Sequence, residues 1–318
     1  MPMSDLAFPP LPSAEAPKVL VTGAAGFIGA WTLRALLFEG YCPVVFDLKE
    51  DRRLVAAICG SVAANMLNWH IGDIRDTDQL QAAAMGTERI IHLAGMLTPG
   101  CRANPRLGAE VNLIGLLNVF AVAQTLNQKS VIYMSSAGVY GPSGGSTPQP
   151  TTLYGAFKLA GEICAQSFWD NDGLASVGVR PYVVYGPGRE IGLSAGPSLA
   201  ARAVAEGRSF TIPFTGLLDM IYVADVATAF MAALKADIAG AHVVNLFGQR
   251  IEAVEVARML DEQASEDISV TATGDPMPIV LPPPDDSAAI LVDWSPTPLS
   301  QGLKQTIKYY RANAGVES

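Results

Sequence analysis

Charged side chains are scarce in this sequence, and positive ones are scarcer than negative ones. Only 16% of the 318 residues are charged, and the formal net charge is −9. Nucleic acids and anionic membrane surfaces attract clustered positive charge, so neither is expected as the main partner. Half of the residues are hydrophobic, which excludes a disordered chain and indicates a globular protein with a large core.

Cysteine and histidine are also few, and they do not cluster. The chain shows no CxxC pair and no metal-ligand spacing among its four cysteines and three histidines: Cys42, Cys59, Cys101, Cys164, His70, His92 and His242. Disulfide frameworks and structural zinc sites depend on such groupings. We therefore expect free thiols in a reducing compartment and no bound metal.

Long apolar runs are missing as well. No uninterrupted apolar stretch reaches the roughly 18 residues needed to span a bilayer. The N-terminus shows no basic segment followed by an apolar core. Residues 1–17 are instead rich in proline and are expected to form a flexible tail. The sequence thus predicts a cytoplasmic protein without a membrane segment.

The chain does have a regular alternation of short β-rich runs and longer helical patterns. Strands are predicted at 18–22, 42–47, 67–71, 89–93, 130–135 and 175–180, and helices near 27–39, 51–64, 76–84, 105–127 and 152–171. This order is typical of βαβ units, so the predicted fold class is α/β with a doubly wound parallel sheet. Proline and glycine then become frequent, before a predicted strand at 290–294 and a final helix near 299–312. We expect the second half to form a smaller lobe, with a substrate cleft beside the sheet.

A glycine-rich turn follows the first predicted strand. Gly23, Gly26 and Gly29 lie where that strand passes into the first predicted helix. Glycines at this spacing allow a tight turn, a close approach to a pyrophosphate, and close packing of helix on strand. The N–H groups at the start of the helix would then face the phosphates. An ordinary glycine-rich turn is the alternative, but later residues favour a dinucleotide site.

Asp47 ends the second predicted strand, eighteen positions after Gly29. An acid at this distance can accept hydrogen bonds from the adenosine ribose and would repel a 2′-phosphate, which favours NAD over NADP. The alternative is that Asp47 caps the helix predicted at 51–64. Arg52 and Arg53 stand nearby and can accommodate a 2′-phosphate, so NADP is not excluded.

Tyr154 and Lys158 lie four residues apart at the start of a predicted helix, on one face of it. A tyrosine is a poor base at neutral pH, but a neighbouring ammonium and an oxidised nicotinamide ring would favour its phenolate. Tyr154 could then take the proton of a substrate hydroxyl. Upstream, Ser136 follows a buried-type strand at the edge where ligands bind, and its hydroxyl could hold the substrate oxygen. The alternative for Ser136 is a turn or capping serine.

These motifs, taken together, resemble the extended short-chain dehydrogenase/reductase family, and within it the NAD-dependent epimerase/dehydratase group. The matching pieces are Thr22-Gly23-x-x-Gly26-x-x-Gly29, Asp47, Asp73-Ile74, His92-Leu93-Ala94-Gly95, Asn112, Ser135-Ser136-x-x-Val139-Tyr140-Gly141, Tyr154-x-x-x-Lys158, Arg180, Tyr185-Gly186-Pro187 and Ile221-Tyr222-Val223-x-Asp225-Val226. The resemblance implies an NAD-binding Rossmann domain over 18–180, with returning segments near 219–248. Residues 181–218 and 249–318 would then form a substrate-binding lobe.

The resemblance also implies roles for single residues. Tyr154 would be the acid/base, Lys158 the partner that lowers its pKa, and Ser136 the hydroxyl that orients the substrate. NAD would be held by Gly23, Ala25, Gly26, Phe27, Ile28, Asp47, Asp73, Ile74, Leu93, Ala94, Gly95, Asn112, Tyr154 and Lys158. The substrate would be contacted by Met96, Thr98, Ser136, Ala137, Tyr154, Val183 and Leu218. His92 would be a structural residue at a strand end.

Two positions depart from the pattern of the nucleotide-sugar members. Those relatives commonly carry an Asn and an Arg that hold the diphosphate, where this chain has Val183 and Leu218. Neither side chain supplies a donor or positive charge, although Arg189 or Arg202 could substitute. We therefore expect an NAD-dependent dehydrogenase that acts on a small sugar, sugar acid, hydroxy acid or amino alcohol. A nucleotide-sugar epimerase or dehydratase is the alternative, and a non-catalytic dinucleotide sensor is a third.

The helices predicted near 105–127 and 152–171 carry long apolar stripes, with the small residues Gly115, Ala160 and Gly161 on their outward side. An exposed apolar patch is a liability that two-fold pairing would bury. Relatives commonly dimerise through these two helices, so the resemblance implies a homodimer. The alternative is that the protein's own core uses both stripes.

Overall fold

A seven-stranded sheet forms the larger part of the molecule, which is described from a computed structural model at residues 7–13, 15–142 and 145–313. All six neighbouring strand pairs in it are parallel. In spatial order the strands are β10 (Ala241–Leu246), β6 (Ala175–Pro181), β5 (Ser130–Met134), β4 (Arg89–His92), β1 (Lys18–Thr22), β2 (Cys42–Asp47) and β3 (Asn68–Ile71). The order reverses next to β1, which confirms the predicted doubly wound α/β fold.

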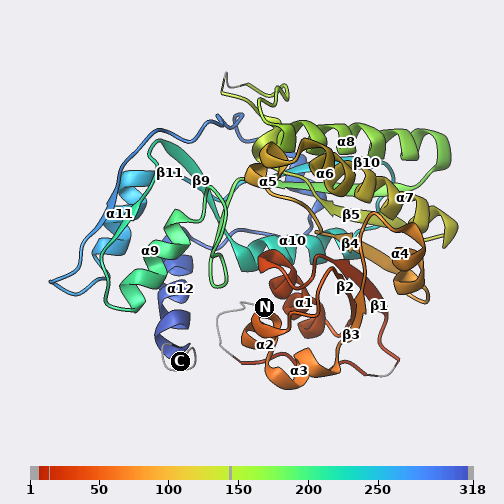
Figure 1. Ribbon diagram of the computed structural model, residues 1–318, viewed down its shortest axis with the longest axis horizontal. Coiled ribbons are helices and arrows are strands. Elements are labelled where there is room, and N and C mark those ends of the chain that lie inside the picture. Colours follow the sequence, from red (N-terminus) through yellow and green to blue (C-terminus); the bar gives the residue numbers. More distant parts are fainter. Residues whose placement is uncertain (1–6, 14, 143–144, 314–318) are drawn as a thin grey trace.

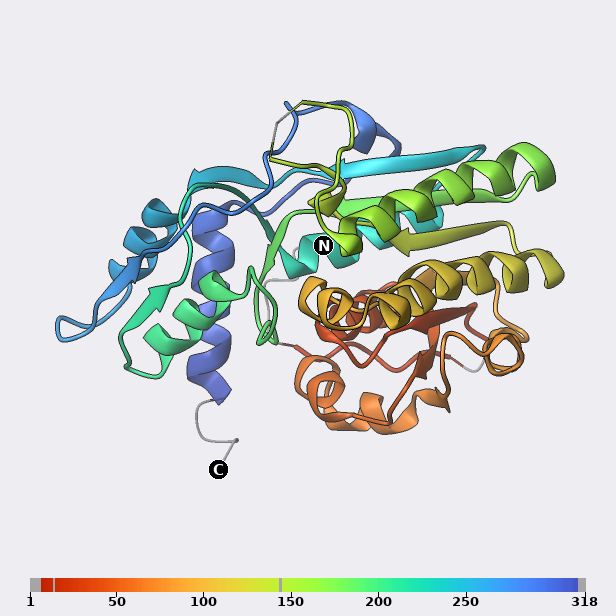
Figure 2. The same cartoon turned by 45° about the horizontal axis from the view of Figure 1, so that its top comes forward.

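Helices cover both faces of this sheet (Figures 1 and 2). One face carries α4 (Thr77–Ala84), α7 (Gly115–Thr125) and α8 (Leu153–Asp172), with α5 (Thr98–Ala103) and α6 (Pro105–Ala109) leading into α7. The other face carries α1 (Phe27–Phe38), α2 (Arg53–Cys59), α3 (Ser61–Met66) and α10 (Val223–Lys235). Strands buried on both faces read as continuous apolar runs, which is why β1, β2 and β5 stand out in the sequence.

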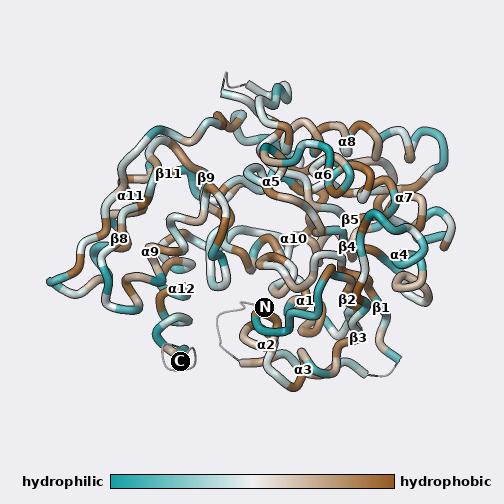
Figure 3. Tube along the Cα trace, in the orientation of Figure 1, coloured by the Kyte–Doolittle hydropathy of each residue, from teal (hydrophilic) through white to brown (hydrophobic). Residues whose placement is uncertain are grey.

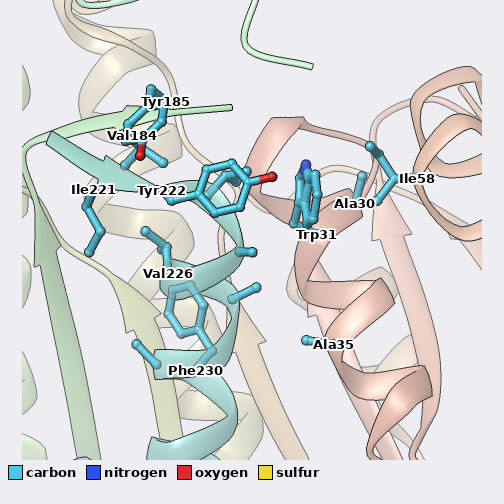
Figure 4. Close-up of a cluster of buried hydrophobic side chains, with 14 of the residues drawn as sticks. Ala30, Trp31, Ala35, Ile58, Val184, Tyr185, Ile221, Tyr222, Val226 and Phe230 are labelled. Carbon is cyan, nitrogen blue, oxygen red and sulfur yellow. The ribbon is translucent and has the colours of Figure 1, made fainter. Parts of the chain in front are cut away.

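The core divides between the two faces of the sheet because side chains alternate along each strand. In β1, Leu20 packs toward α4 and α7, whereas Val19 and Val21 pack toward α1 and α10. Figure 3 shows the hydrophobic stretches along β1 and β2. On the α1 side, the rings of Trp31 and Tyr222 meet edge to face at 5.9 Å, as Figure 4 shows.

A smaller part of the chain lies beyond the carboxyl ends of the strands, on the left of Figure 1. It contains β7 (Val183–Tyr185), β9 (Leu217–Tyr222) and β11 (Gln249–Glu252) in one sheet, and β8 (Phe210–Ile212) with β12 (Val270–Ala272) in another. Its helices are α9 (Gly196–Ala205), α11 (Ala253–Asp261) and α12 (Leu299–Asn313). The core on the α10 side continues into this part without a break.

Two details of the structure differ from the sequence predictions. The helix predicted at 51–64 is broken at Gly60, whose φ of +89° suits glycine and where the Phe8 ring occupies the space of a side chain. The segment 290–294 is not a strand. It follows a 3-10 turn at Ser287–Ile290, Asp293 has a φ of +61°, and the Ser287 hydroxyl accepts a hydrogen bond from the Asn245 N–H of β10.

The described part of the proline-rich tail is largely exposed, but it contacts the rest of the chain near residues 7 and 8. The Ala7 carbonyl accepts a hydrogen bond from Arg34 Nη2 at 2.7 Å, and Phe8 lies against Gly60. Residues 1–6 and 14 of that prediction lie outside the described residues. The tail thus joins the α1 and α2 side of the molecule from residue 7 onward.

The helical stretch Pro105–Thr125 is continuous and contains a π-helical turn at Glu110–Ile114. By length and composition alone it is the one described helix that could cross a membrane. Here it packs on the sheet against β4 and β5 and between α4 and α8. Such a core helix passes the same test of length and apolarity.

Candidate active site

A cavity of about 400 Å³ opens at the carboxyl ends of the central strands. This is the edge where open parallel sheets bind ligands. Ten of the residues predicted for cofactor or substrate line it: Gly23, Gly26, Phe27, Ile28, Leu93, Gly95, Thr98, Ser136, Tyr154 and Lys158. The glycine-rich turn and the Tyr154 region therefore face one common space.

The glycine-rich turn is shaped by close backbone contacts. Gly23 has a φ of +68°, and a Cβ there would lie 2.6 Å from the Ala94 nitrogen. A Cβ on Gly29 would lie 2.4 Å from the Gly23 carbonyl oxygen. Gly26 precedes α1, and no side chain caps the N–H groups at that end of the helix. The turn thus leaves uncapped backbone donors at the cavity, which suits a pyrophosphate.

Asp47 lies beside this turn but does not line the cavity. Its Oδ2 accepts a hydrogen bond from the Ala25 N–H at 2.9 Å, and Oδ1 accepts one from the Leu48 N–H. Burial raises the pKa of Asp47, although these backbone donors oppose the shift. Asp47 is not the cap of a helix at 51–64, because α2 begins after Arg52 without a side-chain cap.

The two arginines near Asp47 already have carboxylate partners. Arg52 pairs with Glu50 at 2.6 Å and lies over the Trp69 ring, and Arg53 pairs with Asp51 at 2.5 Å. A 2′-phosphate would have to compete with these pairs. The pairs are exposed, so each is a weak competitor.

Three other residues predicted to hold NAD, Asp73, Ile74 and Ala94, are used in contacts within the protein. Asp73 is paired with Arg75, which lowers the pKa of Asp73. Ile74 is buried against Gly115. The N–H of Ala94 donates to Thr22 Oγ1 at 3.3 Å. None of these residues lines the cavity.

Asn112 supports the wall of the cavity through hydrogen bonds to the backbone after β4. It is 1% exposed and lies within the π-helical turn. Its Oδ1 accepts a hydrogen bond from the Met96 N–H, and its Nδ2 donates to the carbonyls of Met96 and Gly108. Asn112 therefore holds the segment after β4 in place and does not itself line the cavity.

Ser136 and Tyr154 come together at the end of β5. Ser136 Oγ accepts a hydrogen bond from the Gly138 N–H at 3.0 Å, so it does cap a turn. The Tyr154 ring is close by, since a Cβ on Gly138 would lie 3.2 Å from Ser136 Oγ and 3.5 Å from Tyr154 Cδ1. Burial is the largest influence and raises the pKa of Tyr154, whereas the Ser136 bond and the Arg189 charge lower it.

Lys158 lies one helical turn from Tyr154 and points toward the cavity. Its Nζ donates to the Met134 carbonyl at 2.7 Å and lies 5.7 Å from the centre of the Tyr154 ring. Burial lowers the pKa of Lys158 to about 8. The Arg189 charge also lowers the pKa of Tyr154, and the role predicted for Lys158 as the partner of Tyr154 stays a prediction.

A buried polar network continues from this site across the sheet. Glu162 of α8 accepts hydrogen bonds from the Ser135 hydroxyl and from Arg180, whose Nε lies 2.7 Å away. The Arg180 and Glu162 side chains are only 11% and 5% exposed. Since both charges are paired, the network supports the end of β5 from behind.

The network then reaches the loop that walls the cavity. Arg180 Nη1 donates to the Tyr140 hydroxyl at 2.8 Å, which in turn donates to Asn245 Oδ1 at 3.1 Å. Asn245 Nδ2 donates to Asp285 Oδ2 at 2.6 Å. Asp285 follows the loop residues Met277–Ile279, which line the cavity.

Four residues predicted to contact the substrate do not line the cavity. Val183 and Leu218 are buried in the core, with exposed fractions of 0% and 1%, because they belong to paired strands β7 and β9. Ala137 is buried in the turn after Ser136, and Met96 packs against Gly100. Tyr182 and Val184, the neighbours of Val183, line the cavity instead.

Several lining residues were not assigned from the sequence. They are Leu97, Pro99, Thr151, Thr152, Pro181, Tyr182, Val184, Ile191, Gly192, Leu193, Ser194, Met277, Pro278 and Ile279, together with Arg189, which had been noted only as a substitute diphosphate partner. Most come from loops without a recognisable pattern. The position of Arg189 directly after Tyr185-Gly186-Pro187-Gly188 is the one sequence signal that pointed to it.

His92 is a buried structural residue. It is 1% exposed, and its Nδ1 lies 2.8 Å from Thr22 Oγ1. Burial lowers the pKa of His92 to about 3, so the ring is neutral. Across residues 7–13, 15–142 and 145–313, no group of three His, Cys, Asp or Glu side chains could hold a metal ion.

Known proteins share both the sequence pattern and the fold. A UDP-glucose 4-epimerase of Pisum sativum is 35% identical over 136 residues, which is 40% of this chain and only 39% of that protein. A UDP-glucose 4-epimerase of Cyamopsis tetragonoloba is 30% identical over 293 residues, covering 80% of this chain and 83% of that protein.

The solved structures agree with this relationship. The UDP-glucose 4-epimerase of Thermus thermophilus in complex with NAD superposes with a TM-score of 0.78 and 25% identity, over 92% of this chain and 99% of that chain. The profile of the NAD-dependent epimerase/dehydratase family matches residues 19–246. This chain therefore belongs to the NAD-dependent epimerase/dehydratase family, which is the extended short-chain dehydrogenase/reductase resemblance found in the sequence.

Proposed function

We propose that this protein oxidises a secondary alcohol of a small hydroxylated substrate, with Tyr154 as the acid/base. The observation that carries the proposal is that Tyr154, Ser136 and Lys158 line one cavity with the glycine-rich turn. NAD is the cofactor of the family, and the uncapped start of α1 suits its pyrophosphate. The substrate class is a sugar, sugar acid, hydroxy acid or amino alcohol.

Tyr154, Ser136 and Arg189 have different roles in the proposed reaction. A substrate hydroxyl that exchanges hydrogen bonds with Tyr154 and Ser136 is oriented for proton transfer. The Tyr154 phenolate takes that proton in oxidation and returns it in reduction. Because burial raises the pKa of Tyr154, the nearby Arg189 charge helps to form the phenolate. When bound, NAD supplies the acceptor for the hydride from the same substrate carbon.

Two features support a small substrate. Val183 and Leu218, at the positions where nucleotide-sugar relatives hold a diphosphate, are buried in the core. No residue of the described segment 195–276 lines the cavity, so β8, β9 and β11 contribute nothing to its wall. A nucleotide arm that extends from the reacting sugar would need both polar partners and room there.

A nucleotide-sugar epimerase is the second candidate, and the relatives support it more than they support a dehydrogenase. The two curated relatives described above are both UDP-glucose 4-epimerases. An epimerase would use the same first step at Tyr154, after which the hydride returns to the opposite face of the ketone. It would turn over a nucleotide sugar without net NADH.

NADH formation separates the two candidates. The purified protein is incubated with NAD and a panel of hydroxy acids, sugar acids, sugars and amino alcohols, and NADH absorbance is followed. In parallel, UDP-glucose is incubated with the protein and its epimer is measured by chromatography. Stoichiometric NADH from a small alcohol is expected. Epimer formation without NADH would refute the dehydrogenase and establish the epimerase.

We further infer a homodimer in a reducing compartment such as the cytoplasm. The π-helical turn before α7 and the helix α8 expose large apolar side chains, with Ile114 44% and Ile163 62% exposed. Pairing these helices across a two-fold axis would bury them. All four cysteines are free, which suits a reducing compartment.

A further inference from the structure

Two positive side chains line the cavity, and no carboxylate does so among the described lining residues. The cations are Lys158 and Arg189. Lys158 already donates to the Met134 carbonyl. Neither side chain faces a carboxylate in the described residues, and Arg189 keeps more unused donors than Lys158, so the cavity favours an anion near Arg189.

Arg189 has few partners in the part of the chain that the structure describes. Its Nη2 donates to Ser194 Oγ at 3.3 Å, and its Nε is buried without a hydrogen-bond partner. A guanidinium carries five N–H donors. By contrast, Arg180 and Arg250 face the carboxylates of Glu162 and Asp219.

The guanidinium of Arg189 is also held in place. Its Cζ lies 5.6 Å from the centre of the Phe27 ring, and Ser194 holds one of its nitrogens. Gly192 has a φ of +106°, and a Cβ there would lie 2.9 Å from Nη2. The loop thus packs its backbone against the guanidinium, which leaves the donors fixed before a ligand binds.

We propose that Arg189 binds a carboxylate of the substrate, so that the enzyme acts on hydroxy acids or sugar acids in preference to neutral alcohols. This inference rests on the proposed oxidation at Tyr154. The planar fork of arginine matches a carboxylate with two parallel hydrogen bonds. Because Arg189 and Tyr154 line the same cavity, the carboxylate would lie on the same substrate as the reacting hydroxyl.

The cofactor pyrophosphate is the other anion that could reach this region. It has donors of its own at the uncapped start of α1. An arginine that served the pyrophosphate would change the affinity for NAD, whereas one that serves the substrate would change only the preference for acids. The two roles therefore have different readouts.

The test compares pairs of ligands that differ by a carboxylate. With saturating NAD, dissociation constants are measured by calorimetry for gluconate and glucitol, glucuronate and glucose, and 3-hydroxybutyrate and 2-butanol. The wild-type protein should bind at least one acid about tenfold or more tightly than its neutral partner, a difference of about 1.4 kcal/mol. Arg189→Gln should abolish that preference, and Arg189→Lys should retain part of it because the charge remains.

Two further variants make the test specific. Gly192→Ala, which crowds Nη2, should weaken acid binding with the arginine still present. Arg258→Gln removes a positive charge from the surface of α11, outside the cavity, and should leave the preference unchanged. The NAD dissociation constant should stay within threefold of the wild-type value in Arg189→Gln.

Three results would overturn the proposal. They are no acid preference in the wild-type protein, an unchanged preference in Arg189→Gln, or a loss of NAD affinity in that variant as large as the loss of acid affinity. The binding measurements need no turnover. An acid preference without NADH formation would therefore refute the alcohol oxidation and leave the assignment of Arg189 intact.

Discussion

The replacement Tyr154→Phe tests the proposed chemistry most directly, because it removes one oxygen and keeps the ring. The variant loses the hydroxyl and the hydrogen bond that it can make with Ser136, but retains the aromatic packing around the ring. A positioned acid or base contributes about 10²- to 10⁴-fold to the rate. That range corresponds to about 3–5 kcal/mol of activation free energy.

The same replacement should hardly change the stability of the fold. A hydrogen bond of this kind contributes about 1 kcal/mol to the free energy of unfolding, which in a chain of this size shifts Tm by a few degrees, roughly 2–4 °C. We therefore expect kcat to fall at least about 100-fold while Tm and the NAD dissociation constant stay close to the wild-type values. Steady-state kinetics, thermal unfolding and NAD titration measure the three quantities.

Tyr133→Phe is the matched control. Tyr133 lies in β5, next to the same region, and its buried hydroxyl has no partner among the described residues. Its removal should leave kcat within a few-fold of wild type. In the wild-type protein, alcohol oxidation should also accelerate as pH rises, because the phenolate form is needed and burial raises the pKa of Tyr154. If Tyr154→Phe kept more than a tenth of the wild-type kcat, Tyr154 would not be the acid/base.

Three other predictions concern cofactor choice, the buried network and assembly. Asp47→Ala should weaken NAD binding about tenfold, as expected for a charged hydrogen bond of about 1.5 kcal/mol, and shift the NAD/NADP ratio of kcat/KM toward NADP; an unchanged ratio would make Asp47 purely structural. Glu162→Ala should lower the free energy of unfolding by about 3–5 kcal/mol, because Arg180 is left buried and unpaired, whereas the exposed Glu255→Ala should show no measurable loss in denaturant titration. Ile163→Asp should convert a dimer to a species near 33.5 kDa in light scattering; a wild-type protein already of that mass would refute the dimer.

The central strands of the main sheet could be predicted because they are buried on both faces. β1, β2, β5 and β6 are short, buried and mainly apolar runs, so their alternation with helices is visible in the sequence. The edge strand β10 is less buried at its start and was not predicted as a strand. The glycine-rich turn is equally visible, since close backbone contacts exclude other residues at Gly23 and Gly29. Local features of this kind can be predicted because they depend on only a few neighbouring residues in the sequence.

Features that depend on distant segments could not be predicted in the same way. The break at Gly60 depends on where Phe8 packs, and the turn at Ser287–Ile290 replaces a strand because Ser287 binds the edge of β10. Val183, the first residue of β7, is buried in the core, whereas Tyr182 before it and Val184 after it line the cavity. Alternation alone fixes which residues share a face but not which face binds the ligand.

The chain of hydrogen bonds from Glu162 to Asp285 has a consequence for how a ligand enters. It fastens the wall at Met277–Ile279 to the edge strand β10 and to the catalytic end of β5, so that wall cannot swing outward without breaking the bond between Asn245 and Asp285. The opposite rim is tied as well, because Trp31 Nε1 donates to the Pro187 carbonyl and the Gly188 N–H donates to the Tyr310 hydroxyl, both at 3.0 Å. A ligand should therefore enter a cavity whose two rims are already fixed, and amide hydrogen exchange on both rims should change little when a ligand binds.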